Sequence, residues 1–360
     1  MRTFLVLLAV GCSSTIYEDT DTDAGPADTS DPDWSAVSDA FDAAAPNAPD
    51  TGMTLVLWDA DGQVVYRRTA GGFEPDVRVP VASASKLVSA LLLLRMVDQG
   101  QLSLTDTTGE VLGWTGQKRR ISLDHLGGFT SGFEGTVGCT YNATLSLQDC
   151  TGRMDDAGPE QQPGALFEYT NTHLHIAGAM AEVKGGASWN ALFQRDLAKP
   201  LGLTSPDLRY YTLPKRLLGD TNPLVAGGMV SSVDEYGAFL QLILNKGQVD
   251  GAPFIRPDLI DRLFTNAYTD AEIGSSPVVE VGLDYRYGFG SWLECEGAPA
   301  QCDILNSAGS FGFVPWVDRG RGYAGILAME GDTGSVLTFG LPLQQELRPL
   351  IEAVLDSPAE

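Results

Sequence analysis

The chain has 360 residues, of which 43% are hydrophobic and 19% are charged. This composition is typical of a globular protein with a sizeable core and excludes a disordered or fibrous chain, while the lack of a bilayer-length apolar run excludes a polytopic membrane protein. Lys and Arg number 23 against 47 Asp and Glu, a formal net charge of −24. A surface of this sign repels phosphate backbones and anionic lipids, so nucleic-acid binding is not expected.

The N-terminus has the features of a secretion signal. A single positive charge is followed by an apolar stretch over residues 3–10 that is too short to span a bilayer. The order Ala-Val-Gly-Cys at residues 9–12 resembles the lipobox of bacterial lipoproteins, in which the cysteine is acylated. We therefore expect a signal peptide over residues 1–11, export to the cell envelope, and membrane attachment only through a lipid on Cys12. An ordinary signal peptide that contains a cysteine is the alternative.

An acidic segment follows the signal. Residues 13–50 contain no Lys or Arg and many Asp, Thr, Ser, Ala and Pro, so they offer little apolar surface to offset the entropy of ordering. We predict a tether over residues 12–50 and one folded domain over residues 51–357. The apolar spacing of residues 34–45 suggests a helix that begins the folded body.

The remaining cysteines form two close pairs, Cys139 with Cys150 and Cys295 with Cys302. An exported protein can oxidise them, and local pairing is the simplest of the connectivities that four cysteines allow. Neither pair has a C-x-x-C spacing or a nearby histidine, so we expect two disulfides rather than a zinc site.

Hydrophobic periodicity predicts strands at both ends of the domain and helices between them. Two β-prone runs over residues 53–58 and 64–68 are joined by an Asp-Gly turn. Helices are predicted over residues 87–99, 174–183, 191–197, 232–245, 257–264 and 343–355. Later strands are predicted over residues 287–292, 311–317, 323–329 and 335–341. This order predicts an α/β (α+β) fold, with an antiparallel sheet built from both chain ends, flanking helices and an inserted, mainly helical lobe.

A Ser-x-x-Lys motif opens the first long helix. Helical spacing places Ser83 and Lys86 on one face, where a desolvated lysine can take the proton of the serine hydroxyl. The free N–H groups of a helix N-terminus also suit an oxyanion. Taken alone the motif is weak, because a chain with this much serine contains it by chance.

Two further motifs follow in order: Tyr169-Thr170-Asn171 and Ser307-Ala308-Gly309, the second heading the strand predicted over residues 311–317. Together the three motifs resemble the serine β-lactamase and penicillin-binding-protein superfamily, in particular its class C β-lactamase and esterase branch. Other segments similar to that branch lie at residues 128–132, 199–203 and 226–232. The resemblance covers about residues 50–355 and implies a β-lactamase-like fold.

The resemblance implies a role for each motif residue. Ser83 would be the nucleophile that forms an acyl-enzyme, and Lys86 would be its base. Tyr169 would pass a proton to the leaving group, although either Lys86 or a Tyr169 phenolate could take the first proton. Asn171 would hold the substrate and Lys86 through its amide.

The third motif implies the rest of the binding site and also departs from the family pattern. The backbone N–H groups of Ser83 and of Ser310, which follows Gly309, would form the oxyanion hole. Ser307 stands where the family has Lys or His, and losing that cation weakens binding of a substrate carboxylate by about 1.5–3 kcal/mol. This favours neutral substrates, or a cation supplied from elsewhere, for which the nearest candidates are Arg319 and Arg321. Candidates for an acyl pocket are Phe311, Phe313 and Trp316.

Other catalytic chemistries lack the necessary residues. There is no Gly-x-Ser-x-Gly elbow, and the chain has only three histidines, too few to favour a Ser-His-Asp triad. His173 and His175 should point to different sides of a helix as surface or packing residues, and His125 should lie in a loop near the cleft. Since no phosphate-binding glycine loop is present either, we expect neither a metal nor another cofactor.

The sequence thus predicts an exported serine hydrolase that acts on small-molecule esters, amides or peptides, with carboxylesterase-like activity favoured. A D-alanyl-D-alanine carboxypeptidase or a β-lactamase is the first alternative. A catalytically impaired binding protein of the cell envelope is the second.

Overall fold

The computed structural model describes residues 32–49, 51–267, 271–295, 297 and 299–357. The predicted signal peptide, Cys12 and most of the predicted tether lie outside these residues. Within them, no helix combines the length and the apolar character needed to cross a membrane.

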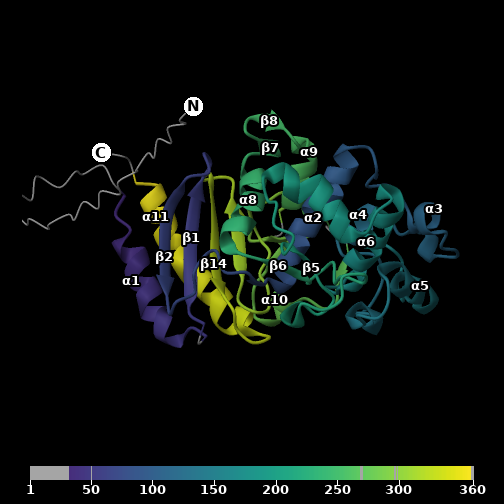
Figure 1. The fold of residues 1–360 in the computed structure, drawn as a ribbon, viewed down its shortest axis with the longest axis horizontal. Coiled ribbons are helices and arrows are strands. Elements are labelled where there is room, and N and C mark those ends of the chain that lie inside the picture. Colours follow the sequence, from purple (N-terminus) through teal and green to yellow (C-terminus); the bar gives the residue numbers. More distant parts are fainter. Residues whose placement is uncertain (1–31, 50, 268–270, 296, 298, 358–360) are drawn as a thin grey trace, which may run out of the picture.

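The two chain ends build one antiparallel sheet of seven strands, in the order β10-β11-β12-β13-β14-β1-β2. Near the N-terminus lie β1 (Met53–Asp59) and β2 (Val64–Ala70). The later strands are β10 (Arg286–Tyr287), β11 (Trp292–Leu293), β12 (Ile304–Asn306), β13 (Val314–Asp318) and β14 (Tyr323–Met329). The two groups join where β1 pairs with β14, from Met53 opposite Met329 to Asp59 opposite Tyr323 (Figure 1).

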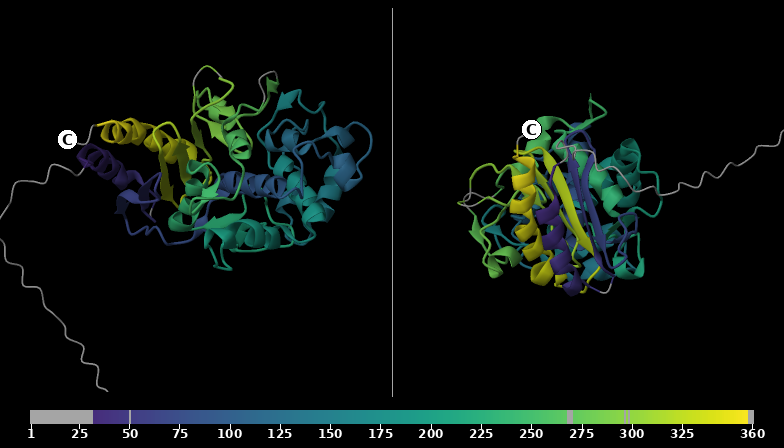
Figure 2. Two further views of the ribbon diagram at one scale, coloured as in Figure 1. Left: turned by 90° about the horizontal axis from the view of Figure 1, so that it is seen from above. Right: turned by 90° about the vertical axis from the view of Figure 1, so that its left-hand side faces the viewer.

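Helices cover both faces of the sheet. Because strand side chains alternate between faces, Leu55 and Leu57 pack in one cluster with residues of α1 (Ser35–Ala44) and α11 (Leu341–Leu355). Figure 2 shows these two helices side by side against the sheet. On the other face, Val56 and Trp58 belong to the main core, which includes α8 (Val233–Leu244). Helix α1 buries Val37 and Phe41 in this arrangement. The folded body therefore begins before residue 51, and the predicted tether is too long at its C-terminal end.

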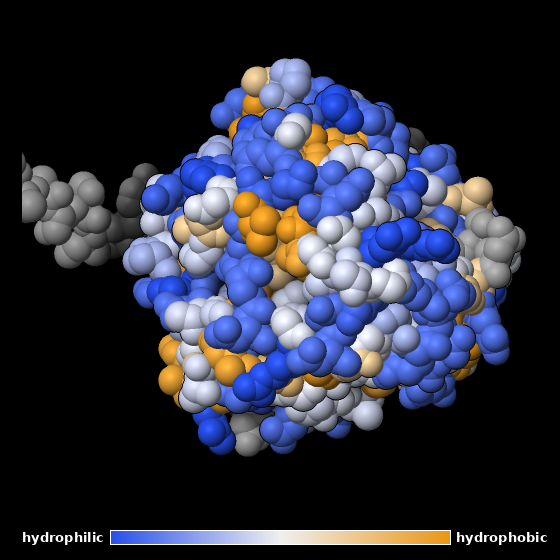
Figure 3. Space-filling view, turned by 90° about the vertical axis from the view of Figure 1, so that its right-hand side faces the viewer, coloured by the Kyte–Doolittle hydropathy of each residue, from blue (hydrophilic) through white to orange (hydrophobic). Residues whose placement is uncertain are grey.

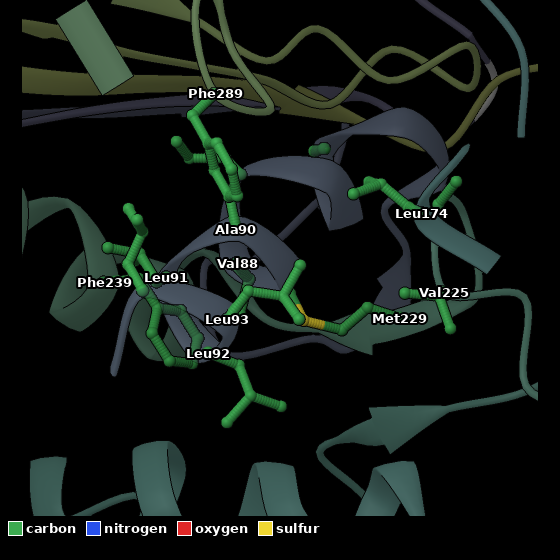
Figure 4. Close-up of a cluster of buried hydrophobic side chains, with 14 of the residues drawn as sticks. Val88, Ala90, Leu91, Leu92, Leu93, Leu174, Val225, Met229, Phe239 and Phe289 are labelled. Atoms are coloured by element: carbon green, nitrogen blue, oxygen red, sulfur yellow. The ribbon is translucent and has the colours of Figure 1, made fainter. Parts of the chain in front are cut away.

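The inserted lobe is mainly helical and is built around α2 (Ser85–Asp98). This helix buries side chains on nearly its whole circumference, and Figure 4 shows them packed among Phe239, Met229 and Phe289. The surrounding helices are α3 (Thr108–Leu112), α4 (Leu123–Gly127), α5 (Leu147–Ala157), α6 (Thr172–Gly185), α7 (Trp189–Leu192), α9 (Pro257–Ile260) and α10 (Pro277–Glu280). The outer end of this lobe is mostly hydrophilic, with small hydrophobic patches (Figure 3).

Short strands complete the lobe. A three-stranded sheet contains β3 (Val79–Pro80), β6 (Met229–Ser231) and β5 (Arg209–Tyr210). Two small pairs are β4 (Leu166–Phe167) with β9 (Glu272–Ile273), and β7 (Gln248–Val249) with β8 (Ala252–Pro253). The fold class is therefore the predicted one, with an antiparallel sheet from both chain ends and an inserted helical lobe.

Several predicted strand boundaries are wrong. Of residues 287–292, only the two ends belong to strands, to β10 and β11. Residues 288–291 form the turn between them, in which Gly290 has a positive φ of 79° and the N–H of Gly288 donates to Ser291 O. Residues 311–313 precede β13 and include Gly312, whose φ is 103°. Residues 336–340 form a π-helix that leads directly into α11 instead of a strand.

Both predicted disulfides are present. Cys139 is bonded to Cys150, and Cys295 is bonded to Cys302. The first bond ties a 3-10 turn (Gly138–Tyr141) to α5.

Candidate active site

Ser83 lies at a cavity of about 510 Å³ between the helical lobe and the sheet. It belongs to a 3-10 turn (Ala82–Ala84) that precedes α2, and not to α2 itself as the sequence suggested. Ala82 has a φ of 48°, a left-handed conformation that costs energy for a residue with a Cβ and is concentrated at functional sites. The turn places Ser83 in the cavity wall and Lys86 one turn further along, in the protein interior.

Lys86 is buried and lies directly behind Ser83. Its Nζ is 3.0 Å from Ser83 Oγ, 2.8 Å from Ala226 O and 3.4 Å from Asn171 Oδ1. Burial lowers the pKa of Lys86 to about 7, since desolvation penalises the ammonium form. A neutral amine has two N–H donors for the two carbonyl acceptors and one lone pair for the Ser83 hydroxyl. The site therefore accommodates the basic form of this lysine.

Tyr169 lies on the other side of Lys86. Its ring stacks on Trp292 at 4.8 Å and faces Lys86 Nζ at the same distance. Burial raises the pKa of Tyr169 to about 12, and hydrogen bonds with the side chains of Ser83 and Trp292 lower it only in part. At neutral pH the phenol therefore keeps its proton and Lys86 is the stronger candidate for the first base, a choice that the sequence left open.

Asn171 connects Lys86 to the mouth of the cavity. It directly precedes α6, its Oδ1 faces Lys86 Nζ, and its Nδ2 donates to the hydroxyl of Tyr141 at 2.9 Å. Tyr141 lies in the turn held by the Cys139–Cys150 disulfide and lines the cavity. The sequence gives no signal for Tyr141, because no motif contains it and only the fold brings it to Asn171.

The third motif lies at the turn between β12 and β13, so Ser307 follows β12 and does not head a strand as predicted. Ser307 Oγ donates to Ser83 O at 3.1 Å. A Cβ on Gly309 would lie 2.1 Å from Val81 O, so only glycine allows this turn to approach the nucleophile so closely. Ser310 lines the cavity, and its N–H meets no acceptor among the described residues. A free N–H at the cavity suits an oxyanion donor. The oxyanion hole formed by the N–H groups of Ser83 and Ser310 stays a prediction.

The cations at the cavity differ from those proposed on the sequence. Neither Arg319 nor Arg321 lines the cavity. Arg319 forms ion pairs with Asp261 and Asp303. Arg321 forms ion pairs with Asp318, Glu352 and Asp356. The cavity instead receives Lys215 and Arg216, from a 3-10 turn (Pro214–Arg216). No motif marked these residues, because they approach the site only through the pairing of β5 with β6.

Of the three aromatic residues suggested for an acyl pocket, only Phe311 lines the cavity. Phe313 and Trp316 are fully buried in the core, where Phe313 packs against Tyr236. Phe311 and Phe313 lie in the turn before β13, on either side of Gly312, and this turn brings only the ring of Phe311 to the cavity.

The histidines take structural positions. His173 and His175 are fully buried in α6 and hydrogen-bond to different partners, Ser131 and Glu168 O for the first and Asn222 for the second. Burial lowers the pKa of each to about 4. Of the two positions expected for these histidines, surface or packing, the structure shows the packing position. His125 belongs to α4, where it takes part in a capping box, and not to a loop.

Comparisons with known proteins agree with this architecture. Penicillin-binding protein 4 of Amycolatopsis lactamdurans is 29% identical over 167 residues, which cover 43% of this chain and 41% of that protein. The chain thus matches less than half the length of this curated relative.

Solved structures match over more of the chain. A protein of Bacteroides dorei DSM 17855 assigned as a beta-lactamase superimposes with a TM-score of 0.77 at 23% identity, covering 91% of this chain and all of that one. EstCE1, described as a hydrolase with promiscuous acyltransferase activity, superimposes with a TM-score of 0.69 at 19% identity, covering 88% and 98% of the two chains. At these identities the superpositions establish the fold. The sequence model of the Beta-lactamase family matches residues 41–342, most of the chain, and the protein therefore belongs to the beta-lactamase family of serine hydrolases.

Proposed function

We propose that this protein is a serine hydrolase that cleaves esters or amides through a covalent acyl-enzyme on Ser83. The observation that carries the proposal is the contact of Ser83 Oγ with the buried amine of Lys86, whose pKa lies near 7 and whose other neighbours are carbonyl acceptors. Such a pair activates a hydroxyl that is otherwise a weak nucleophile.

Each step uses residues that face the cavity or Lys86. Lys86 Nζ takes the proton of Ser83 as Oγ attacks the substrate carbonyl carbon. The N–H groups of Ser83 and Ser310 receive the resulting oxyanion. When the bond to the leaving group breaks, Tyr169 donates its proton to that group and regains one from the Lys86 ammonium. Water then attacks the acyl carbon and gives a proton to Lys86. As the bond from the acyl carbon to Ser83 Oγ breaks, Lys86 returns that proton to Oγ, and the acid leaves.

Ester cleavage is the activity we favour. Ser307 carries no charge beside the nucleophile, and the cavity wall combines apolar side chains such as Leu213, Leu224 and Phe311 with the reactive hydroxyl. The similarity in fold to a hydrolase with acyltransferase activity is consistent with this choice. The alternative is action on β-lactams or on peptides ending in D-alanine, which the similarity to a penicillin-binding protein motivates.

We further propose that the protein is exported and tethered by a lipid on Cys12. Two disulfides within the folded body are typical of proteins oxidised outside the cytoplasm. The small residues before Cys12 match the pattern of a lipoprotein signal. Intact-mass measurement of the protein extracted from membranes tests this, since a diacylglycerol adduct on a chain starting at Cys12 is expected and an unmodified N-terminus would reject the anchor.

The decisive experiment compares hydrolysis of a short-chain nitrophenyl ester by the purified full-length protein and three variants. Ser83→Ala and Lys86→Ala should lose several powers of ten in kcat/KM. Lys199→Ala is the matched control, because Lys199 is exposed and outside the cavity lining. A slow substrate should also add its acyl mass to Ser83 in the native protein. Equal rates in all four proteins would overturn the proposal.

The alternative activities are separated by a second measurement. Incubation with a labelled penicillin, followed by peptide mapping, should modify Ser83 if the site accepts β-lactams. No adduct at high concentration, combined with turnover of esters, would leave the esterase assignment. Ligand binding that survives Ser83→Ala, with no turnover of any ester by the native protein, would instead indicate a binding protein.

A further inference from the structure

Two cations line the active-site cavity without a carboxylate partner. Most Lys and Arg side chains in the described part of this acidic chain are ion-paired, for example Arg78 with Glu235 and Arg209 with Asp220. Lys215 and Arg216 form no ion pair with the described residues. Among the described residues that line the cavity there is no Asp or Glu. The described lining thus carries two positive charges and no negative one, in a protein with a formal net charge of −24. Glu330 and Asp332 line a neighbouring hollow that Lys215 also borders, but neither forms an ion pair with it.

The fold fixes the position of Lys215. Its turn is closed by two backbone hydrogen bonds between Leu213 and Leu218. Nζ of Lys215 donates to Gly331 O at 2.9 Å and lies 4.2 Å from the centre of the Phe311 ring. These contacts limit the motion of a side chain that is usually flexible, so less entropy is lost when it binds a ligand.

Lys215 retains binding capacity in this position. An ammonium group has three N–H donors, and Gly331 O is the only acceptor that the described residues supply to it. Phe311 lines the same cavity as Ser83, so an anion bound by Lys215 lies in the space that a substrate of Ser83 occupies. Arg216 adds a second positive charge to the same wall.

We propose that Lys215 and Arg216 form an anion subsite that binds a carboxylate of the substrate, so that the preferred esters or amides are acidic. The inference rests on the proposed hydrolase function of Ser83. The carboxylate belongs either to the acyl part or to the leaving group, and both place a negative charge near Lys215. Phe311 provides an apolar surface for the carbon skeleton that carries it.

Two matched pairs of esters test the subsite. For the leaving group, a 3-carboxyphenyl ester is compared with its neutral methyl-carboxylate analogue. For the acyl part, a nitrophenyl hemisuccinate is compared with nitrophenyl butyrate. In one of the two pairs, the ratio of kcat/KM for the acidic ester to that for the neutral ester should fall about tenfold to hundredfold in Lys215→Met. The pair that responds identifies which part of the substrate carries the charge.

Further variants separate charge from structure. Lys215→Arg should retain most of the ratio, Arg216→Met should lower it, and Lys199→Met should leave it unchanged. Added salt should reduce the ratio in the native protein, because a partly exposed ion pair is screened. Ratios in Lys215→Met and Arg216→Met equal to those of the native protein in both ester pairs would overturn the subsite.

A binding measurement tests the subsite independently of turnover. The Ser83→Ala variant is titrated calorimetrically with 3-hydroxybenzoate and with succinate, and the neutral methyl 3-hydroxybenzoate and succinamide are the controls. At least one acid should bind more tightly than its control, and Lys215→Met should weaken that binding about tenfold or more. If the acids bind in this way but no ester is cleaved, the hydrolase proposal fails and the anion subsite stands. If esters are cleaved and neither acid is preferred, the anion subsite fails and the hydrolase proposal stands.

Discussion

Arg348 of α11 forms an ion pair with Glu294, whose carboxylate is fully buried where β11 ends. The same carboxylate accepts a hydrogen bond from Asn306 Nδ2, and Asn306 Oδ1 accepts one from the N–H of Ala308. These contacts connect the last helix of the chain to the third motif. The orientation of the turn beside Ser83 therefore depends on a helix on the opposite face of the sheet.

Replacing Arg348 tests this connection. Arg348→Met leaves the buried carboxylate of Glu294 without its cation, which should cost about 3–5 kcal/mol in the free energy of unfolding, measured with urea. Arg256→Met removes an exposed pair with Asp258 and should cost about 0–1 kcal/mol. Similar losses in both variants would mean that the buried pair is not specially important for stability.

The pH dependence of hydrolysis should report Lys86. Only the neutral amine can accept the proton of Ser83, so kcat/KM should rise with pH through an apparent pKa of about 7. Burial raises the pKa of Tyr169 to about 12, so no decline from its ionisation is expected between pH 5.5 and pH 8.5. A flat profile between pH 5.5 and pH 8.5 would contradict the assignment of Lys86 as the base.

Stability should respond to the same group. The unfolded chain protonates Lys86 up to its usual pKa of 10.5, whereas the folded protein releases that proton near pH 7. Between these values the unfolded state binds more protons, so stability relative to Lys86→Met should rise with pH by about 1.4 kcal/mol per pH unit. Below pH 7 the difference should be constant. Urea unfolding of both proteins from pH 6 to pH 9 measures the slope, and a difference that is independent of pH would show that Lys86 remains charged when folded.

Tyr169→Phe should separate proton transfer from packing. The ring can still stack on Trp292, so the variant should fold, but it cannot donate a proton to the leaving group. We expect a loss of about 100-fold to 10,000-fold in kcat for an alkyl ester, whose leaving group needs a proton, and a smaller loss for a nitrophenyl ester. Equal losses for both esters would assign Tyr169 a positioning role instead.

Gly309→Ala should disturb the oxyanion donors. The new Cβ would lie 2.1 Å from Val81 O, so the turn before β13 must move away from Ser83. Since small displacements of catalytic groups are costly, ester hydrolysis should fall by about 100-fold. Gly152→Ala is the control, because a Cβ there meets nothing within 4 Å and Gly152 lies within α5, where alanine is favoured. Native-like activity in Gly309→Ala would show that the close approach of this turn is unnecessary.

The sequence alone determined the fold class, the two disulfides and the contact of Ser83 with Lys86 in the Ser-x-x-Lys motif. Periodicity located α2, α8, α11, β1 and β14, because each of these elements has an apolar pattern of its own. The Asp-Gly turn after β1 located β2. The motifs were recognisable because the residues of each lie within three positions of one another, so local geometry already brings them together. The predictions for Tyr169, Asn171 and Ser310 came from the order of such motifs along the chain.

Only the tertiary structure decided which residues from distant segments share the cavity. Lys215, Arg216 and Tyr141 reach it through strand pairing and a disulfide, and no local pattern distinguishes them from other surface residues. The turn at Gly288–Gly290 and the helical start at residue 336 went unpredicted, because an apolar stretch of that length is compatible with a strand, a turn or a helix. The choice of Lys86 over Tyr169 as the base likewise depends on burial, since desolvation shifts their two pKa values in opposite directions and a sequence does not specify the depth of a side chain.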